Sequence, residues 1–147
     1  MEIFLKSPEF KQLNAGFALD EGLANEQDAF KVYYGERSPW WIWLTASGNA
    51  GHGSKFIEPS ASIRLVKVLN HFIKWRDHEQ ERMERDGLKL GQVTTTNITM
   101  LKAGVQMNVV HEKAEAGIDM RVSPLEDFEA LRKKVLEWIH SEPGVLF

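Results

Sequence analysis

Four residues are the best candidates for a chemical role: a carboxylate, a histidine, an amide and an arginine. The carboxylate is Glu21. It follows Asp20 at the end of a short apolar run, residues 15–19, and it precedes Gly22. Carboxylates at the end of a strand bind metals or take part in acid–base catalysis, because the scaffold fixes their oxygens. The same residues also suit a helix N-cap or a surface turn, so the pattern by itself leaves both interpretations open.

The histidine is His52, which lies between Gly51 and Gly53 in a glycine-rich loop. Glycines on both sides let the backbone come close to a ligand and leave the imidazole accessible. A loop histidine without a role is the alternative interpretation. The remaining histidines, His71, His78, His111 and His140, are weaker candidates. His71 and His78 lie on one predicted helix, and we interpret both as surface or interface residues.

The amide and the arginine are Asn108 and Arg121. Arg121 is expected on the open face of a strand, where its planar fork suits a carboxylate in two-point contact. Asn108 lies at the entry to the neighbouring strand and could donate to a substrate oxygen. The alternative for Arg121 is a salt bridge with Asp119 or Glu115, and the sequence leaves it open.

The tryptophans Trp40, Trp41 and Trp43 could form a platform for a sugar or a nucleobase. Alternate positions of a strand face opposite sides, however, and one side of this strand should meet the helix layer. We therefore expect these rings in the core and at an interface.

The most regular pattern in the chain runs from residue 113 to residue 122, where apolar and polar residues alternate. The apolar set is Ala114, Ala116, Ile118, Met120 and Val122. A period of two predicts a strand that is buried on one side and open on the other. Aromatic and β-branched residues predict further strands over residues 40–46 and 92–101, and Ala103-Gly104 is expected to form a turn or a bulge.

Two helices are predicted between and after these strands. The first begins at Glu58-Pro59-Ser60, with Pro59 in its first turn, carries an apolar stripe, and ends at Gly87. The second opens with the capping box of residues 123–126 and ends at Pro143-Gly144. Residues 145–147 have the composition of the first residues of a strand.

From Arg37 onward the predicted order is strand, helix, strand, strand, helix and the start of a strand. This is the split βαβ order of the ferredoxin-like fold, an α+β class in which both helices cover one face of the sheet. The face with Asp119 and Arg121 should stay open. Residues 1–36 do not belong to this unit: we predict a helix over residues 1–13 that Pro8 disturbs, and strands over residues 15–19 and 30–34, without a core of their own.

Composition excludes several classes of protein. The 147 residues carry a formal net charge of −3 and no cysteine, which excludes disulfides and Cys-ligated metal sites. The mild acidity argues against nucleic-acid binding through a generally basic surface. No apolar run approaches the ~20 residues of a membrane span, and residues 1–6 lack the pattern of a signal peptide.

The candidate residues lie in segments whose order is informative. The segments are FALDEGLAN at 17–25, ERSPWW at 36–41, GHGS at 51–54, NVV at 108–110 and DMRV at 119–122. Together they resemble the aminoacylase branch of the zinc-dependent amidohydrolases and peptidases, a family that also includes carnosinases and bacterial glutamate carboxypeptidases. The resemblance covers essentially the whole chain.

The resemblance implies a cytoplasmic homodimer that hydrolyses N-acyl-L-amino acids to a carboxylate and an L-amino acid, with two zinc ions per subunit. Residues 1–36 would be the last piece of the first half of the catalytic domain. Residues 37–147 would be the lid, which makes the dimer, with its last strand truncated. Glu21 would be a zinc ligand, and His52 would stabilise the oxyanion in the other subunit's active site. Asn108 and Arg121 would bind the substrate.

The chain also departs from this family. Its His-x-Asp motif, its Glu-Glu pair and its late histidine are missing, and His111 stands where a proline is usual. We therefore expect an internal fragment of a longer enzyme, which would be inactive alone. A non-catalytic ferredoxin-like module for dimerisation or regulation is the alternative. A nucleic-acid-binding module of the same fold class is disfavoured by the net charge.

Overall fold

The computed structural model describes residues 2–20, 22 and 25–147, and the chain divides into two units, Met1–Tyr34 and Gly35–Phe147. In the first unit, α1 (Glu2–Leu5) and α2 (Pro8–Leu13) are separate helices, so the single helix predicted over residues 1–13 is wrong. Ser7 is the N-cap of α2: its hydroxyl accepts a hydrogen bond from the Phe10 N–H at 3.2 Å, and Pro8 lies in the first turn.

The strands predicted over residues 15–19 and 30–34 do not form. No described residue between 14 and 37 belongs to a helix or strand, and no described residue of the first unit is buried. A strand needs a neighbour for its backbone hydrogen bonds, and these segments have none. Large apolar side chains consequently stay in solvent; they are Ile3, Phe17, Leu19, Phe30, Val32 and Tyr34.

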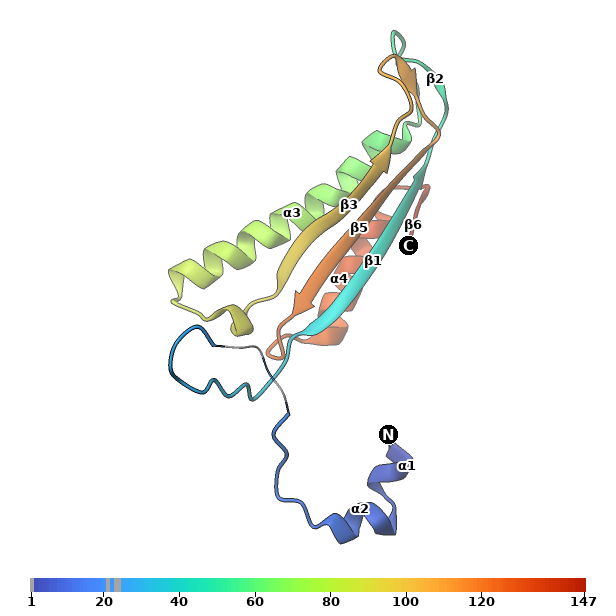
Figure 1. Ribbon diagram of the computed structural model, residues 1–147. Coiled ribbons are helices and arrows are strands. Elements are labelled where there is room, and N and C mark those ends of the chain that lie inside the picture. The colour runs from blue at the N-terminus through green and yellow to red at the C-terminus, as the bar shows by residue number, and fades with distance from the viewer. Residues whose placement is uncertain (1, 21, 23–24) are drawn as a thin grey trace. The chain divides into compact units, whose positions relative to one another are not determined.

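The second unit is a four-stranded antiparallel sheet with two helices on one face (Figure 1). The strands are β1 (Ser38–Ser47), β3 (Thr95–Ala103), β5 (Lys113–Val122) and β6 (Val145–Leu146), in the order β3-β5-β1-β6. The helices are α3 (Ala61–Arg85) and α4 (Phe128–His140). A short 3₁₀ helix, η1 (Leu90–Gln92), precedes β3. This topology confirms the ferredoxin-like prediction.

The two central strands, β1 and β5, pair over their whole length, from Ser38 opposite Val122 to Ser47 opposite Lys113. The alternation predicted for β5 is confirmed, since its apolar set is buried against the helices. Trp40 packs on this core, whereas Trp41 and Trp43 lie on the other face of the sheet, which neither α3 nor α4 covers. The register of β3 shifts between Ile98 and Met100, so a bulge lies inside this strand.

Both helices begin later than the sequence predicts. Before α3, the carbonyls of Glu58 and Pro59 accept hydrogen bonds from the Asn49 side chain at 2.8 Å and its backbone N–H at 2.7 Å. The first turn therefore starts only at Ala61, after Pro59. Asp127 caps α4 by accepting from the Ala130 N–H at 3.0 Å.

The capping box predicted at residues 123–126 is wrong, because α4 begins only at Phe128 and Asp127 is its cap. Ser123 is fully buried, and its hydroxyl accepts from the Leu125 N–H at 3.3 Å. Its hydroxyl donates to the Gly91 carbonyl at 3.1 Å, and its N–H donates to the Thr94 hydroxyl at 3.1 Å. These bonds join the end of β5 to the start of β3. No helix in the described part of the chain combines the length and the apolar character that crossing a bilayer requires.

A buried carboxylate joins the end of α3 to the same region. Glu79 is 3 % exposed and accepts from the Thr94 N–H at 2.8 Å and from two Arg82 nitrogens at 2.9 and 2.7 Å. Burial alone would raise the pKa of Glu79. The hydrogen bonds from Arg82 and Thr94, together with the positive charge of Arg82, outweigh burial and lower that pKa.

We expect Glu79→Gln to lower the free energy of unfolding by about 1–3 kcal/mol at pH 7, because the hydrogen bonds lose their charged acceptor. A lowered native pKa stabilises the fold above the ordinary carboxyl pKa, and this contribution disappears as the pH falls through the native pKa. Urea denaturation should therefore show a difference from wild type that shrinks toward pH 3. The exposed Glu81→Gln is the matched control, and a difference that persists at low pH would contradict the assignment.

Candidate functional site

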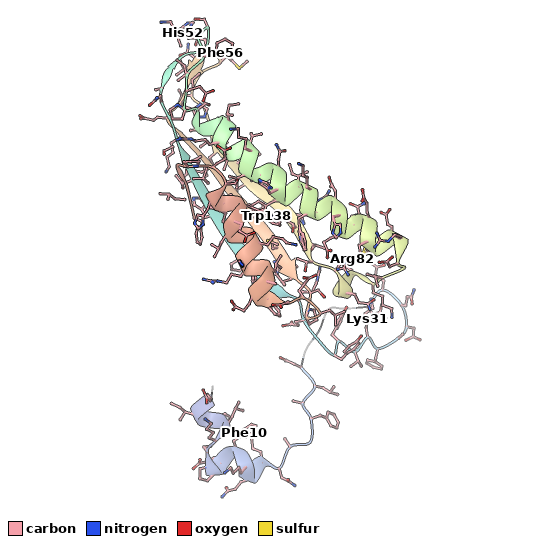
Figure 2. The ribbon with its side chains drawn as sticks, turned by 180° about the vertical axis from the view of Figure 1, so that it is seen from behind. Phe10, Lys31, His52, Phe56, Arg82 and Trp138 are labelled. Atoms are coloured by element: carbon pink, nitrogen blue, oxygen red, sulfur yellow. The ribbon has the colours of Figure 1, made fainter. Side chains whose placement is uncertain are left out.

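The sheet extends at one end into an arm, which we define as residues 48–57 and 104–111. Two short strands, β2 (Gly51–His52) and β4 (Val109–Val110), pair antiparallel within it, with His52 opposite Val109. The Gly53 N–H donates to the Asn108 carbonyl at 2.8 Å. The arm therefore brings together His52 and Asn108, two candidates that are far apart in the sequence, and Figure 2 shows His52 at its tip.

The base of the arm is held by Gly48. Its N–H donates to the Glu112 carbonyl at 2.9 Å, and the next residue, Asn49, holds the chain before α3. A Cβ atom on Gly48 would lie 2.4 Å from the Ala61 nitrogen and 2.5 Å from the Pro59 carbonyl oxygen. Both are backbone atoms, so only glycine allows this close approach.

The imidazole of His52 is exposed and is held from one side. Its Nδ1 lies 2.8 Å from the Ser54 hydroxyl and 3.2 Å from the Ser54 backbone nitrogen, which donates to it. Among the described residues, Nε2 has no hydrogen-bond partner. Ser54 was not among the residues predicted from the sequence, although a serine two positions after a histidine in a glycine-rich turn is a recognisable signal.

The arm also carries large apolar side chains that are exposed. Phe56 and Met107 are entirely exposed, and Val105 is largely so (Figure 2 labels Phe56). His111, which replaces the usual proline, has its Nε2 2.8 Å from the Ser62 hydroxyl and so links the base of the arm to the first turn of α3.

Arg121 lies at the opposite end of the sheet from the arm, on the open face as predicted. It is paired with Asp119 of the same strand: Nη2 donates to Oδ2 at 2.9 Å, and Nε lies 2.8 Å from Oδ1. The salt bridge that the sequence left open as an alternative is therefore present. It engages one edge of the guanidinium and leaves Nη1 for another acceptor.

The arm and Arg121 are too far apart to serve one small substrate within a subunit. A strand rises about 3.3 Å per residue, so roughly 26 Å of β5 separate Lys113, which adjoins the arm, from Arg121. An N-acyl amino acid is far shorter. Figure 1 shows the arm beyond one end of the sheet, and the end of β5 lies at the other.

The described residues do not by themselves fit a zinc ion. They contain no group of three or more His, Cys, Asp and Glu side chains that could hold a metal. Glu21, the predicted ligand, lies outside the described residues. His71 of α3 stacks on Trp138 of α4 with ring centroids 6.2 Å apart, whereas His78 is an exposed residue beside Trp75 of its own helix, with ring centroids 5.8 Å apart.

Comparison with known proteins defines the class of this fold. The chain belongs to the peptidase dimerisation domain family, whose model matches residues 34–145. A metallo-carboxypeptidase from Sulfolobus solfataricus shares the fold with a TM-score of 0.52 at 14% identity, over 76% of this chain and 37% of that one. An aminobenzoyl-glutamate utilization protein from Klebsiella pneumoniae has a TM-score of 0.52 at 12% identity, over 72% and 25% of the two chains.

Curated relatives extend the similarity to the whole chain. It is 48% identical to aminoacylase-1 of Sus scrofa over 148 residues and 50% identical to aminoacylase-1A of Rattus norvegicus over 149 residues. Aminoacylase-1 of Dictyostelium discoideum is 42% identical over 159 residues. The resemblance to the aminoacylase branch is thus confirmed. The chain spans about a third of the length of these relatives, 36% for the porcine protein.

We expect Gly48→Ala to lower the free energy of unfolding by about 1–3 kcal/mol, since the added Cβ must displace backbone at the start of α3. Gly91→Ala is the matched control, because a Cβ there meets nothing within 4 Å, and it should change stability by less than about 0.5 kcal/mol. Urea denaturation of both variants measures the difference. Equal stability of the two would show that the base of the arm tolerates a side chain.

Proposed function

We propose that this chain is the lid, with an adjoining piece of the catalytic domain, of a cytoplasmic zinc aminoacylase that hydrolyses N-acyl-L-amino acids. The observation that carries the proposal is the separation of the arm from Arg121 within a chain that is about 48% identical to aminoacylase-1. Residues that cannot meet in one subunit can meet in a dimer. The two units of the chain would correspond to residues 1–36 and 37–147.

The exposure of apolar side chains in the first 36 residues supports this division. Their apolar side chains, among them Phe17 and Phe30, are exposed, as expected of a segment that packs against the rest of a catalytic domain. In that domain Glu21 would be one ligand of a pair of zinc ions. Zinc, when bound, lowers the pKa of a water molecule and polarises the acyl carbonyl. The other ligands and the general base would come from the remainder of the enzyme.

A surface for pairing with a second copy lies along α3 and β3. β3 is an edge strand, hydrogen-bonded only to β5 within the sheet, so its outer backbone groups can pair with another chain. Beside it, exposed apolar residues follow the outer side of α3 and continue onto β3; they are Ile63, Val66, Ile73 and Leu101. An open edge beside an apolar stripe suits a homodimer, in which both copies present the same patch.

In such a dimer the residues have separate tasks. His52 and Asn108, which share the arm, would enter the partner's active site together and donate to the oxyanion and to a substrate oxygen. Arg121 would act in its own subunit and bind the substrate carboxylate through the part of its fork that Asp119 leaves free. Each active site would then combine the arm of one subunit with the sheet end of the other.

Arg121→Lys should lower kcat/KM for an N-acyl amino acid at least tenfold, about 1.4 kcal/mol, because a lysine keeps the charge but loses the two-point contact. The measurement uses a chimeric enzyme, porcine aminoacylase-1 in which this chain replaces the segment that it matches. Arg132→Lys on the exposed side of α4 is the control. Unchanged kcat/KM in the Arg121 variant would remove Arg121 from the proposed site.

Mixed dimers of the chimeric enzyme test the sharing of the active site. An inactive His52→Ala subunit mixed with a subunit inactivated at Glu21 or Arg121 should regain up to about half of the wild-type activity per mixed dimer, because one site then has all its groups.

His52→Ala mixed with Asn108→Ala should regain none, since both residues lie in the arm and each site lacks one of them. With subunit exchange verified, no recovery in the first mixtures would mean that His52 acts within its own subunit or not at all. Recovery of activity in the mixture of His52→Ala with Asn108→Ala would show that Asn108 and His52 act in different active sites. If His52→Ala alone leaves turnover nearly unchanged, His52 is an exposed loop residue without a role.

A further inference from the structure

We propose that Ser54 is a positioning residue that holds the neutral imidazole of His52 with its proton on Nε2. The structural part of this inference concerns the arm alone. Its catalytic consequence rests on the proposed function, in which His52 donates to an oxyanion.

The contacts at Nδ1 determine the tautomer. A backbone N–H can only donate, and the Ser54 nitrogen lies 3.2 Å from Nδ1 with its hydrogen directed at the ring. Nδ1 must therefore present its lone pair. The Ser54 hydroxyl, 2.8 Å away, can then also donate to this nitrogen and gives the shorter contact. A proton on Nδ1 would face the Ser54 N–H directly, so the proton of the neutral ring belongs on Nε2.

The loop around the histidine fixes these donors in place. The Lys55 N–H donates to the His52 carbonyl at 3.1 Å, which closes a tight turn over Gly53 and Ser54. The Gly53 N–H is tied to the Asn108 carbonyl across the two-stranded sheet. The position of the Ser54 backbone is therefore set by the arm, and the hydroxyl adds a second donor that depends on the side chain.

This arrangement prepares Nε2 as a hydrogen-bond donor at the tip of the arm. A neutral ring can donate to a developing oxyanion from Nε2 only if that nitrogen carries the proton. Donors that are oriented in advance need no rearrangement when charge develops in the transition state. In the other tautomer Nε2 would offer a lone pair and would repel the oxyanion.

The first experiment reads the tautomer without any catalysis. Nitrogen-15 NMR of the His52 ring in this chain, at a pH well above the ordinary histidine pKa of about 6.5, should show a protonated Nε2 and an unprotonated Nδ1. Ser54→Ala should shift the populations partly toward the other tautomer, since the hydroxyl is lost and the backbone donor remains, and Ser54→Thr should retain the wild-type spectrum. A proton on Nδ1 in the wild-type chain, or identical populations in all three proteins, would overturn the proposal.

The second experiment reads the catalytic consequence in the chimeric enzyme. Ser54→Ala should lower kcat about 2- to 10-fold with little change in KM, Ser54→Thr should restore it, and Arg132→Lys on the exposed side of α4 should leave it unchanged. In the His52→Ala background, Ser54→Ala should cause no further loss, because Ser54 acts through the histidine.

A further loss of the same size in that background would overturn the positioning role. If His52→Ala is itself harmless, the proposed function of His52 fails, and the NMR result still decides whether Ser54 sets the tautomer.

Discussion

The whole arrangement depends on the ten-residue pairing of β1 with β5. Its register places Ser47 opposite Lys113 at one end and Ser38 opposite Val122 at the other. Because successive side chains of a strand alternate, this register also decides that Met120 is buried under the helices and that Asp119 and Arg121 face away from them. A slip of one residue would exchange the two faces and place a salt bridge in the apolar core.

Short contacts at both ends of the sheet protect that register. At the end near the arm, the Gly48 N–H donates to the Glu112 carbonyl, and Gly48 lies directly against the backbone before and at the start of α3. At the other end, Ser123 and Glu79 hold the approach to β3 through backbone and side-chain hydrogen bonds. The apolar core between them supplies most of the stabilisation, whereas the polar contacts select one alignment of the strands.

The sequence predicts those features that depend on local periodicity. The alternation over residues 113–122 predicts the strand, its buried side and the open face of Arg121, and all three are observed. Helix starts are predicted less well. Ser123 has the pattern of a cap, but its hydroxyl donates to a distant carbonyl and accepts from the Leu125 N–H, and Asp127 caps the helix instead. The strands expected before residue 36 fail for a related reason, because pairing needs a partner that the local sequence does not contain.

The candidate site divides in the same way. Residue types predict His52, Asn108 and Arg121 as candidates, but their grouping follows from the pairing of β2 with β4 and from the length of β5, which are properties of the folded chain. Ser54 is two residues from His52, and its role still requires the turn geometry that directs its N–H at the ring.

The proposed tautomer of His52 also limits the proton transfers in which this ring can take part. A ring whose Nδ1 already accepts hydrogen bonds and whose Nε2 carries the hydrogen has no lone pair to offer at the tip of the arm. In this tautomer His52 can stabilise negative charge there but cannot remove a proton from an attacking water. A hydrolysis in which His52 is the oxyanion donor therefore needs a base other than His52 to accept the proton of the attacking water.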